Sequence, residues 1–406
     1  MSRFFTAIFI VAILALSVSS SPAQQTPHIR ITGEGSGKNT ITVAPMRDDK
    51  GQAALVFRKV LRDNLQRSGW FQTVDGESAG IRVSGNLSSA GGISVAVTVE
   101  WLPSGSFTWA RRGAADDARP LALELCDEIT RRVMGRPGMA SAPILLVGKR
   151  AGGTDIYSCD SDGGRLRRIT TDGKICLSPS WLPDRSGFLY TAYLKDFAAI
   201  HKVEFGPPAR RELLAGFPGL NNGGVVSPDG KLAAMVLSLS GNVELYVMNL
   251  ATKRLTRRTT TPHANESSPN WSPDGSQLVY VSDAGRSPQV YTMRSSDKEG
   301  KRLVFGLSES VAPDWGSDGT ITFCGRQGGR YGIYTINPQT GGAPKLVSPA
   351  DGRDYEDPSW APDARHIVCT RTAGRRRSLV ILDTLGDTPV ELIPIEGEWY
   401  LADWSK

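Results

Sequence analysis

Short apolar runs separated by polar links recur from about residue 140 to the end of the chain. One such unit has apolar runs at 278–281 and 289–293, followed by a shorter outer segment at 301–304. Runs of four to six residues that end at turn residues are typical of β-strands. Together with one more strand that precedes each unit's first turn, this pattern predicts repeated groups of four short strands.

A tryptophan marks the end of that preceding strand in nearly every unit. Val226 stands where one tryptophan is missing, and counting it, successive positions are 44 or 45 residues apart: Trp181, Val226, Trp271, Trp315, Trp360 and Trp404. A fixed period of about 40 to 45 residues with one tryptophan and one turn per unit is typical of a β-propeller, in which each repeat forms a blade. The spacing predicts a mainly β chain with six blades.

A turn motif follows these positions. Ser-Pro-Asp-Gly stands at 272–275 and again at 227–230, and the other copies keep the aspartate. Proline presets φ, the aspartate carboxylate accepts hydrogen bonds from the local backbone, and glycine adopts the positive φ of a tight turn. We therefore interpret these aspartates as structural and expect each turn to join the tryptophan strand to the next strand.

The first and last units are incomplete, and each has what the other lacks. The first begins at Ile144 without a tryptophan strand, and the chain ends on Tyr400 to Trp404, an innermost strand with nothing after it. We expect the C-terminal strand to complete the first blade. This closure would remove a sheet edge that is otherwise free to pair with other chains.

Residues 24–139 have a different pattern of apolar positions, which predicts a small α/β domain before a propeller at 140–406. Apolar residues at helical spacing predict helices at 53–67 and 120–134. Alternating apolar residues predict strands at 29–31, 41–45, 81–85 and 93–101.

Residues 1–23 have the features of a signal peptide. Arg3 precedes an uncharged apolar run at 4–16, and small residues at 21–23 form a cleavage site near Ala23. The run is too short for a comfortable membrane span. We expect an exported, periplasmic protein that meets membranes only through partners.

The charge and the reactive side chains of the chain exclude several classes of function. The net charge is +6, but the basic pairs are scattered along the chain. We therefore expect these pairs to lie on solvated blade edges and not on a surface for an acidic partner, and we exclude nucleic acid as a ligand. The four histidines lack metal-ligand spacing, and no catalytic constellation is recognisable, so we predict no enzyme activity, metal or cofactor. Among five cysteines only Cys159 and Cys176 are candidates for a disulfide, and the sequence leaves their pairing open.

The motifs together resemble the TolB family, the periplasmic component of the Tol-Pal envelope system. The stretches 61–71 and 123–144 and the Trp-Ser-Pro-Asp-Gly blades carry this resemblance. It implies a monomeric, non-enzymatic adaptor that supports outer-membrane integrity and constriction during cell division. Such an adaptor would bind the peptidoglycan-associated lipoprotein Pal through the propeller and the inner-membrane protein TolA through the mature N-terminal segment: Gln24, Gln25, Thr26, Pro27 and His28.

The loops that enter the innermost strands are expected to surround the mouth of the central channel, on the face away from the Ser-Pro-Asp-Gly turns. We assign the Pal surface to polar residues of these loops: Asn221, Asn222, His263, Asn265, Glu266, Glu309, Tyr355 and Glu356. The alternative is an exported propeller that binds glycan or serves as an accessory subunit of an envelope hydrolase. Whether the channel holds a cation or water is left open.

Overall fold

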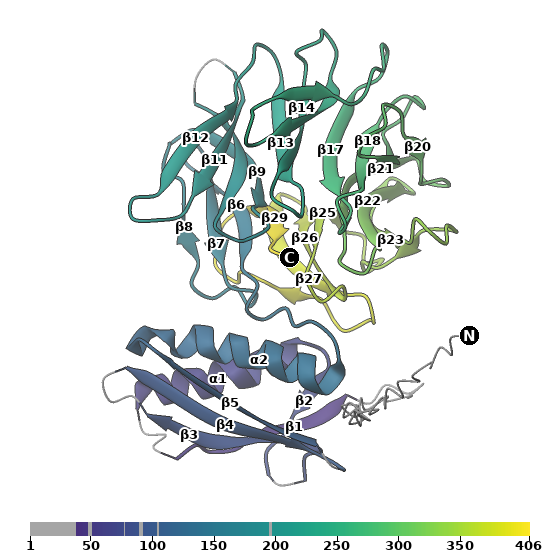
Figure 1. Cartoon of the computed structure of the whole chain (residues 1–406). Coiled ribbons are helices and arrows are strands. Elements are labelled where there is room, and N and C mark those ends of the chain that lie inside the picture. The colour runs from purple at the N-terminus through teal and green to yellow at the C-terminus, as the bar shows by residue number, and fades with distance from the viewer. Residues whose placement is uncertain (1–37, 48–50, 77, 89–91, 104, 195–196) are drawn as a thin grey trace, which may run out of the picture.

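The computed structural model describes residues 38–47, 51–76, 78–88, 92–103, 105–194 and 197–406 (Figure 1). The predicted signal peptide, the predicted strand at 29–31 and the segment from Gln24 to His28 lie outside the described residues. Within the described part, no helix is both long and apolar enough to cross a lipid bilayer.

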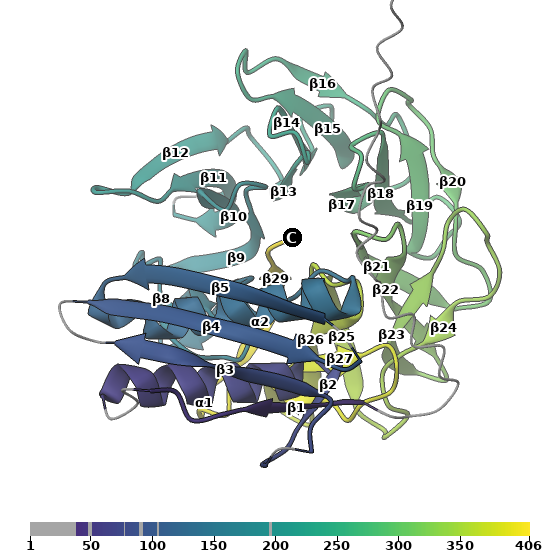
Figure 2. The same cartoon turned by 60° about the horizontal axis from the view of Figure 1, so that its bottom comes forward.

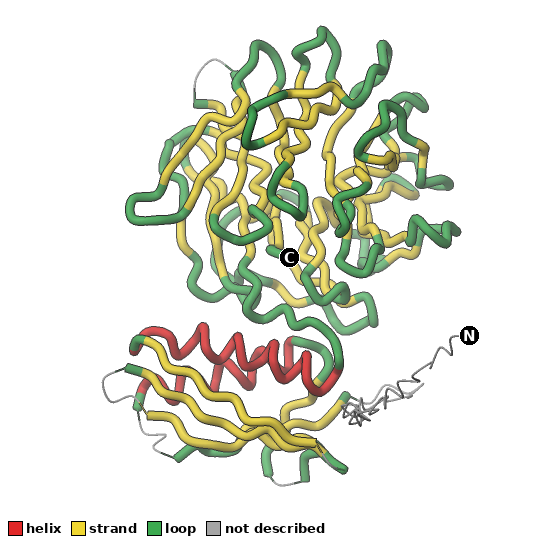
Figure 3. Tube along the Cα trace, viewed as in Figure 1, coloured by secondary structure: helices red, strands yellow, loops and turns green. Residues whose placement is uncertain are grey.

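The N-terminal unit is a five-stranded sheet with both α-helices on one face. Strand order is β2-β1-β3-β4-β5, with β1 parallel to β2 and β3 and the remaining pairs antiparallel. The helices lie between this sheet and the propeller (Figures 1 and 3). The elements are β1 (Asn39–Val43), α1 (Gln52–Arg67), β2 (Phe71–Thr73), β3 (Ile81–Ser88), β4 (Ile93–Trp101), β5 (Gly105–Gly113), the 3-10 helix η1 (Ala115–Asp117) and α2 (Ala118–Met134).

The helical spacing read from the sequence explains how these helices pack. In α1, Phe57, Leu61 and Leu65 are fully buried against the sheet. They lie four residues apart and so share one face of the helix. Helix α2 ends at Gly135, which takes the left-handed conformation (φ 64°) that glycine adopts without strain. The chain then runs into the propeller.

The remaining strands form six four-stranded groups arranged in a ring (Figure 2). Four of the groups are separate sheets, and the other two share an eight-stranded sheet joined by one parallel pair, Thr154 with Ile175. Blade 1 contains β29 (Trp399–Trp404), β6 (Ile144–Arg150), β7 (Gly153–Cys159) and β8 (Arg167–Arg168), and blade 2 contains β9 (Ile175–Trp181), β10 (Gly187–Tyr193), β11 (Ala199–Glu204) and β12 (Arg210–Ala215).

The other four blades follow in chain order, each from its innermost to its outermost strand. Blade 3 contains β13 (Asn221–Val226), β14 (Leu232–Leu237), β15 (Glu244–Asn249) and β16 (Leu255–Arg257), and blade 4 contains β17 (Glu266–Trp271), β18 (Gln277–Ser282), β19 (Gln289–Arg294) and β20 (Lys301–Arg302). Blade 5 contains β21 (Glu309–Trp315), β22 (Ile321–Gln327), β23 (Arg330–Ile336) and β24 (Lys345–Leu346), and blade 6 contains β25 (Asp354–Trp360), β26 (His366–Ala373), β27 (Arg376–Asp383) and β28 (Val390–Glu391).

The C-terminal strand closes the ring, as the sequence predicted. Strand β29 pairs antiparallel with β6, with Trp404 opposite Ile144 and Tyr400 opposite Val147. Trp404 is 1% exposed, and its indole N–H donates to the Ala142 carbonyl at 3.1 Å. The two ends of the propeller are therefore joined by a sheet and not by a covalent connection.

The repeated turns have the predicted chemistry. Asp274 accepts a hydrogen bond from the Ser276 amide at 3.0 Å, and the turn aspartates of the other complete turns make the equivalent bond. Gly275 adopts a φ of 70°. At the same turn position, blades 2 and 6 have Arg185 (φ 59°) and Ala364 (φ 53°), which are not glycines.

Replacing Gly275 with alanine tests this turn. A Cβ at Gly275 would meet no atom closer than 3.5 Å, so the substitution adds conformational strain without a clash. An L-residue in the left-handed region costs roughly 1–2 kcal/mol. We expect Gly275→Ala to lower the free energy of unfolding by about that amount, as measured by urea denaturation. The reverse substitution, Ala364→Gly, should raise the free energy of unfolding. If the turns tolerated either residue equally, the two variants would not change this free energy in opposite directions.

Each innermost strand contains a bulge three residues before its last residue. The pairing register shifts there in all six blades. A β-bulge bends its strand and redirects side chains. The residue at each bulge has a left-handed φ of 48–54°: Ser178, Gly223, Ser268, Ala312, Asp357 and Leu401.

All five cysteines are buried and unpaired. The question left open for Cys159 and Cys176 is thereby answered for this structure, because neither forms a disulfide. Burial also raises the pKa of the Cys176 thiol to about 11, so this thiol is protonated at neutral pH.

Candidate functional site

The ring has two faces, which the direction of the innermost strands defines. We call the open face the one where these strands begin, at Ile175, Asn221, Glu266, Glu309, Asp354 and Trp399. We call the turn face the one where they end at the tryptophan positions and the Ser-Pro-Asp-Gly turns follow.

The N-terminal unit lies against the turn face. Asn64 of α1 donates to Asp162 at 2.9 Å, and Arg119 of α2 pairs with Asp160 at 2.5 Å. Both aspartates follow the end of β7, on the turn face of blade 1. Figure 2 shows the unit over the part of the ring that contains β8, β25, β26, β27 and β29. The described part of the N-terminal unit therefore leaves the open face free.

A buried ionic cluster on blade 6 forms a second contact between the two units. The Arg365 guanidinium lies over the Trp70 ring, 4.4 Å from its centroid, and pairs with Asp383 at 2.6 Å. His366 lies 2.6 Å from Asp363 and 3.5 Å from Asp383. Burial by itself lowers the pKa of His366, but the two carboxylates outweigh it and raise that pKa to about 9, so the imidazole is charged at neutral pH.

The eight polar residues assigned from the sequence all lie on the open face, but six of them lie in the first half of an innermost strand and only His263 and Asn265 lie in a loop. Three of the eight are buried. Asn221 is fully buried. Its side-chain amide donates to the Phe217 carbonyl at 2.6 Å and accepts from the Phe217 backbone amide at 3.0 Å. Glu266 is 1% exposed and accepts from Thr261 at 2.7 Å, and Tyr355 is 2% exposed. These three side chains support the loops and present little surface to a partner.

The other five of these residues are exposed or partly exposed. Asn222, His263 and Asn265 are exposed, and Glu309 and Glu356 are partly exposed. Glu309 accepts from Tyr331 at 2.5 Å and pairs with Arg326 at 2.9 Å, and these two partners lower the pKa of its carboxyl. The open face therefore carries amides, an imidazole and fixed carboxylates around the channel mouth.

Sequence reasoning missed the apolar residues of this face. Six of the exposed large apolar side chains lie in its loops or at its strand ends: Ile175, Tyr193, Phe197, Leu239, Phe305 and Ile395. Phe305 is the most exposed of them at 63%. Exposed aromatic and aliphatic side chains grouped on one face are typical of protein interfaces. The available signal was the presence of large apolar residues inside otherwise polar loops.

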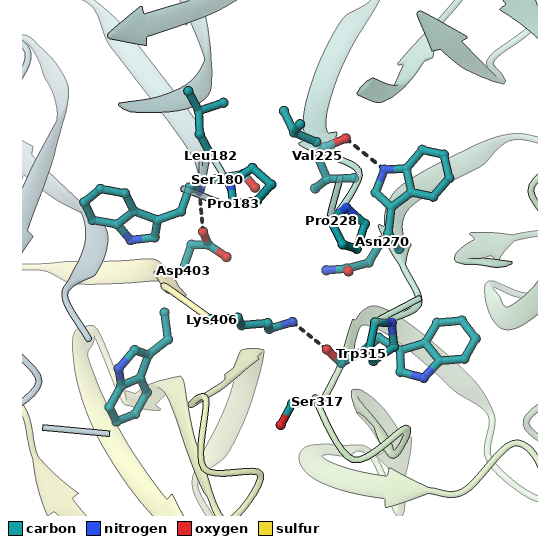
Figure 4. A pocket seen from close by; sticks show the side chains of 15 residues that line it. Ser180, Leu182, Pro183, Val225, Pro228, Asn270, Trp315, Ser317, Asp403 and Lys406 are labelled. Atoms are coloured by element: carbon teal, nitrogen blue, oxygen red, sulfur yellow. Dashed lines mark hydrogen bonds between the residues drawn. The ribbon is translucent and has the colours of Figure 1, made fainter. Parts of the chain in front are cut away.

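The central channel contains two cavities. One, of about 190 Å³, is lined by the bulge residues of all six innermost strands. The other, of about 320 Å³, lies nearer the turn face, where Figure 4 shows Asp403 and Lys406 beside the ring tryptophans. Lys406 donates to Asp314 at 2.5 Å and to the Trp315 carbonyl at 2.6 Å. The C-terminus thus lies inside the channel.

Carboxylates in the channel connect neighbouring blades. Asp403 accepts from the Trp181 amide and Asp314 from the Trp360 amide, both at 2.7 Å. Burial raises the pKa of Asp403 to about 7 and that of Asp357 to about 6. These contacts have a structural role. Within the residues that the structure describes, no group of three or more His, Cys, Asp or Glu side chains is arranged to hold a metal ion.

A ring of six four-stranded units, closed by its own C-terminal strand, defines a β-propeller protein. A family model described as the TolB beta propeller domain matches residues 131–406, and the chain belongs to this family.

Full-length relatives and a solved structure agree with this assignment. The chain is 25% identical to a protein TolB homolog of Chlorobium luteolum, over 95% of this chain and 94% of the relative. It is also 25% identical to a Tol-Pal system protein TolB of Bordetella pertussis, over 98% of this chain and 94% of the relative. The crystal structure of TolB from Acinetobacter baumannii matches with a TM-score of 0.81 and 24% identity, covering 91% of this chain and 97% of that chain. This structural match extends the shared fold to the N-terminal unit.

Proposed function

We propose that this protein is a periplasmic, non-enzymatic component of a Tol-Pal system. The observation that carries the proposal is the match to a Tol-Pal system protein TolB over nearly the whole length of both chains. In this proposal the chain comprises a signal peptide at 1–23, an N-terminal domain at 24–139 and a propeller at 140–406.

The open face is the proposed binding surface for a Pal-like lipoprotein. The described part of the N-terminal unit contacts the turn face, which leaves the open face available for a partner. The exposed members of the assigned set surround the channel mouth there, together with the six apolar side chains. A surface with exposed apolar side chains and a polar surround fits a protein partner. A TolA-like protein would bind the segment from Gln24 to His28.

Capture from solubilised cell envelope tests this assignment. Asn222→Lys combined with Glu356→Lys should reduce recovery of the Pal-like lipoprotein about tenfold or more, because both changes put a long cation into the proposed contact. The control is Glu212→Lys on the outer strand β12, where Glu212 is 51% exposed and pairs with Lys253. Recovery is measured by quantitative mass spectrometry.

The outcomes separate the alternatives. Undiminished recovery of the lipoprotein by the double variant, or an equal loss with Glu212→Lys, would contradict the assigned face. A chain lacking residues 24–28 should lose the TolA-like protein and keep the lipoprotein. Capture of a glycan or of an envelope hydrolase in place of both proteins would favour the alternative function.

A further inference from the structure

A cavity of about 280 Å³ opens on the turn face between blades 1 and 2. Its lining contains three arginines and one carboxylate, together with aromatic and small residues: Pro143, Ser158, Cys159, Asp160, Arg165, Arg167, Trp181, Arg185 and Phe205. The cavity lies outside the channel and away from the open face. The proposed adaptor function does not use it.

The single carboxylate of the lining is already paired. Asp160 accepts from Arg119 at 2.5 Å and from Arg165 at 2.7 Å. Arg167 donates to the Ser158 hydroxyl at 3.0 Å and lies 6.0 Å from the centroid of the Phe205 ring. Arg167 is exposed and, within the described part of the chain, forms no ion pair, so its guanidinium is available to an anion in the cavity.

Arg185 is the second arginine of the cavity lining that forms no ion pair with a described residue. The nearest opposing charge that acts on it is Asp127 of α2, which lies too far away for an ion pair and is itself held by the amides of Ala140 and Ser141 at 2.7 and 2.9 Å. Burial lowers the pKa of the guanidinium, and Asp127 opposes that effect. A guanidinium that is partly removed from water without a paired anion is an unfavourable arrangement for a purely structural role.

The backbone conformation at Arg185 is one that glycine adopts more readily than arginine. It stands at the turn position that glycine occupies in blades 3, 4 and 5, and its φ is 59°. A large side chain is therefore kept where the turn itself favours glycine. Blade 6 has another residue other than glycine, Ala364, at this position with a φ of 53°.

A neutral donor completes the set. Trp181 lines the same cavity and is 9% exposed, and its indole N–H is buried without a hydrogen-bond acceptor. The indoles of Trp271, Trp315 and Trp404 have backbone acceptors, whereas the buried indole of Trp360 has none, like that of Trp181. Buried donors are normally satisfied. The Trp181 N–H therefore adds an unsatisfied donor to a lining that already contains two guanidinium groups without ion pairs.

We propose that this cavity binds a small oxyanion, either a carboxylate or a phosphate group, through Arg167, Arg185 and the indole of Trp181. Guanidinium groups bind both oxyanions through paired N–H donors. Because the cavity lies beside α2 and the start of the propeller, a bound anion would neutralise charge next to the contact between the two units.

Isothermal titration calorimetry on the purified full chain tests the site. Sodium acetate and inorganic phosphate are titrated separately at constant ionic strength, with chloride as the background anion. We expect saturable binding of at least one of them, and the two titrations distinguish a carboxylate site from a phosphate site. Arg185→Gly should weaken that binding about tenfold or more, since it removes charge-assisted hydrogen bonds. Arg167→Gln should have a similar effect.

The variants are chosen so that loss of folding is not mistaken for loss of binding. Glycine adopts the backbone conformation of residue 185 freely, so Arg185→Gly should unfold no earlier than the wild type on heating. Ala364→Gly makes the same backbone change in blade 6, far from the cavity, and should leave anion binding unchanged. Absence of saturable binding for both anions, or unchanged affinity in Arg185→Gly, would overturn the proposal.

Discussion

Deletion of residues 398–406 is expected to prevent the chain from forming a stable ring. The deletion removes β29, which pairs with β6 and buries Trp404 against blades 1 and 6. Loss of one buried tryptophan side chain alone costs about 3–5 kcal/mol, and the strand pairing is lost as well. Since whole proteins are stable by about 5–15 kcal/mol, the propeller of the truncated chain should unfold at a much lower temperature than that of the full chain in circular dichroism.

Two variants make this experiment specific. Lys406→Ala removes the ion pair with Asp314 and the hydrogen bond to the Trp315 carbonyl but leaves β29 in place, and it should retain a transition close to that of the full chain. Trp404→Phe keeps most of the apolar contact and should lie between the two. A truncated chain that melts like the full chain would show that β29 does not close the ring.

The second large effect is expected at Asp383, in the buried cluster on blade 6. Asp383→Asn leaves the charges of Arg365 and His366 with less compensation, although Asp363 remains beside His366. Removing one partner of a buried ion pair costs about 3–5 kcal/mol. We expect a loss of that size in the free energy of unfolding by urea. A loss below about 1 kcal/mol would mean that the cluster is well solvated.

The same cluster gives the expected dependence on pH. The pKa of His366 is raised above its ordinary value of 6.5 to about 9 in the folded chain. Its contribution to stability is therefore complete below about pH 6.5 and is lost as the pH rises through about 9. The control is His366→Gln, in which this part of the pH dependence should be missing. Equal curves for both proteins would exclude His366 as the titrating group.

The regular repeat made the ring predictable from the sequence. A period of 44 or 45 residues is a local property of each blade, and the Trp404 strand matched the gap before Ile144. The turn chemistry was equally local, because each aspartate bonds to the amide two residues later, as Asp274 does to Ser276. Such short-range patterns can be read without knowing what packs against them.

The properties that depend on distant contacts were not predictable. Asn221 and Glu266 are polar and are the first residues of β13 and β17, so nothing local indicates that their side chains are buried. Arg119 and Asp160 are 41 positions apart and belong to different units, and their ion pair depends on how the N-terminal unit lies against the ring. The cavity between blades 1 and 2 is likewise formed only when the blades are assembled.

The pairing of β29 with β6 also has a consequence for how fast the chain folds. It joins residues such as Lys149 and Glu398, which are 249 positions apart. Contacts between such distant segments form slowly, because the chain between them must first be ordered. Until then β6 presents an unpaired edge that can join another molecule. We therefore expect refolding yield to fall with increasing protein concentration, with a holding chaperone restoring it.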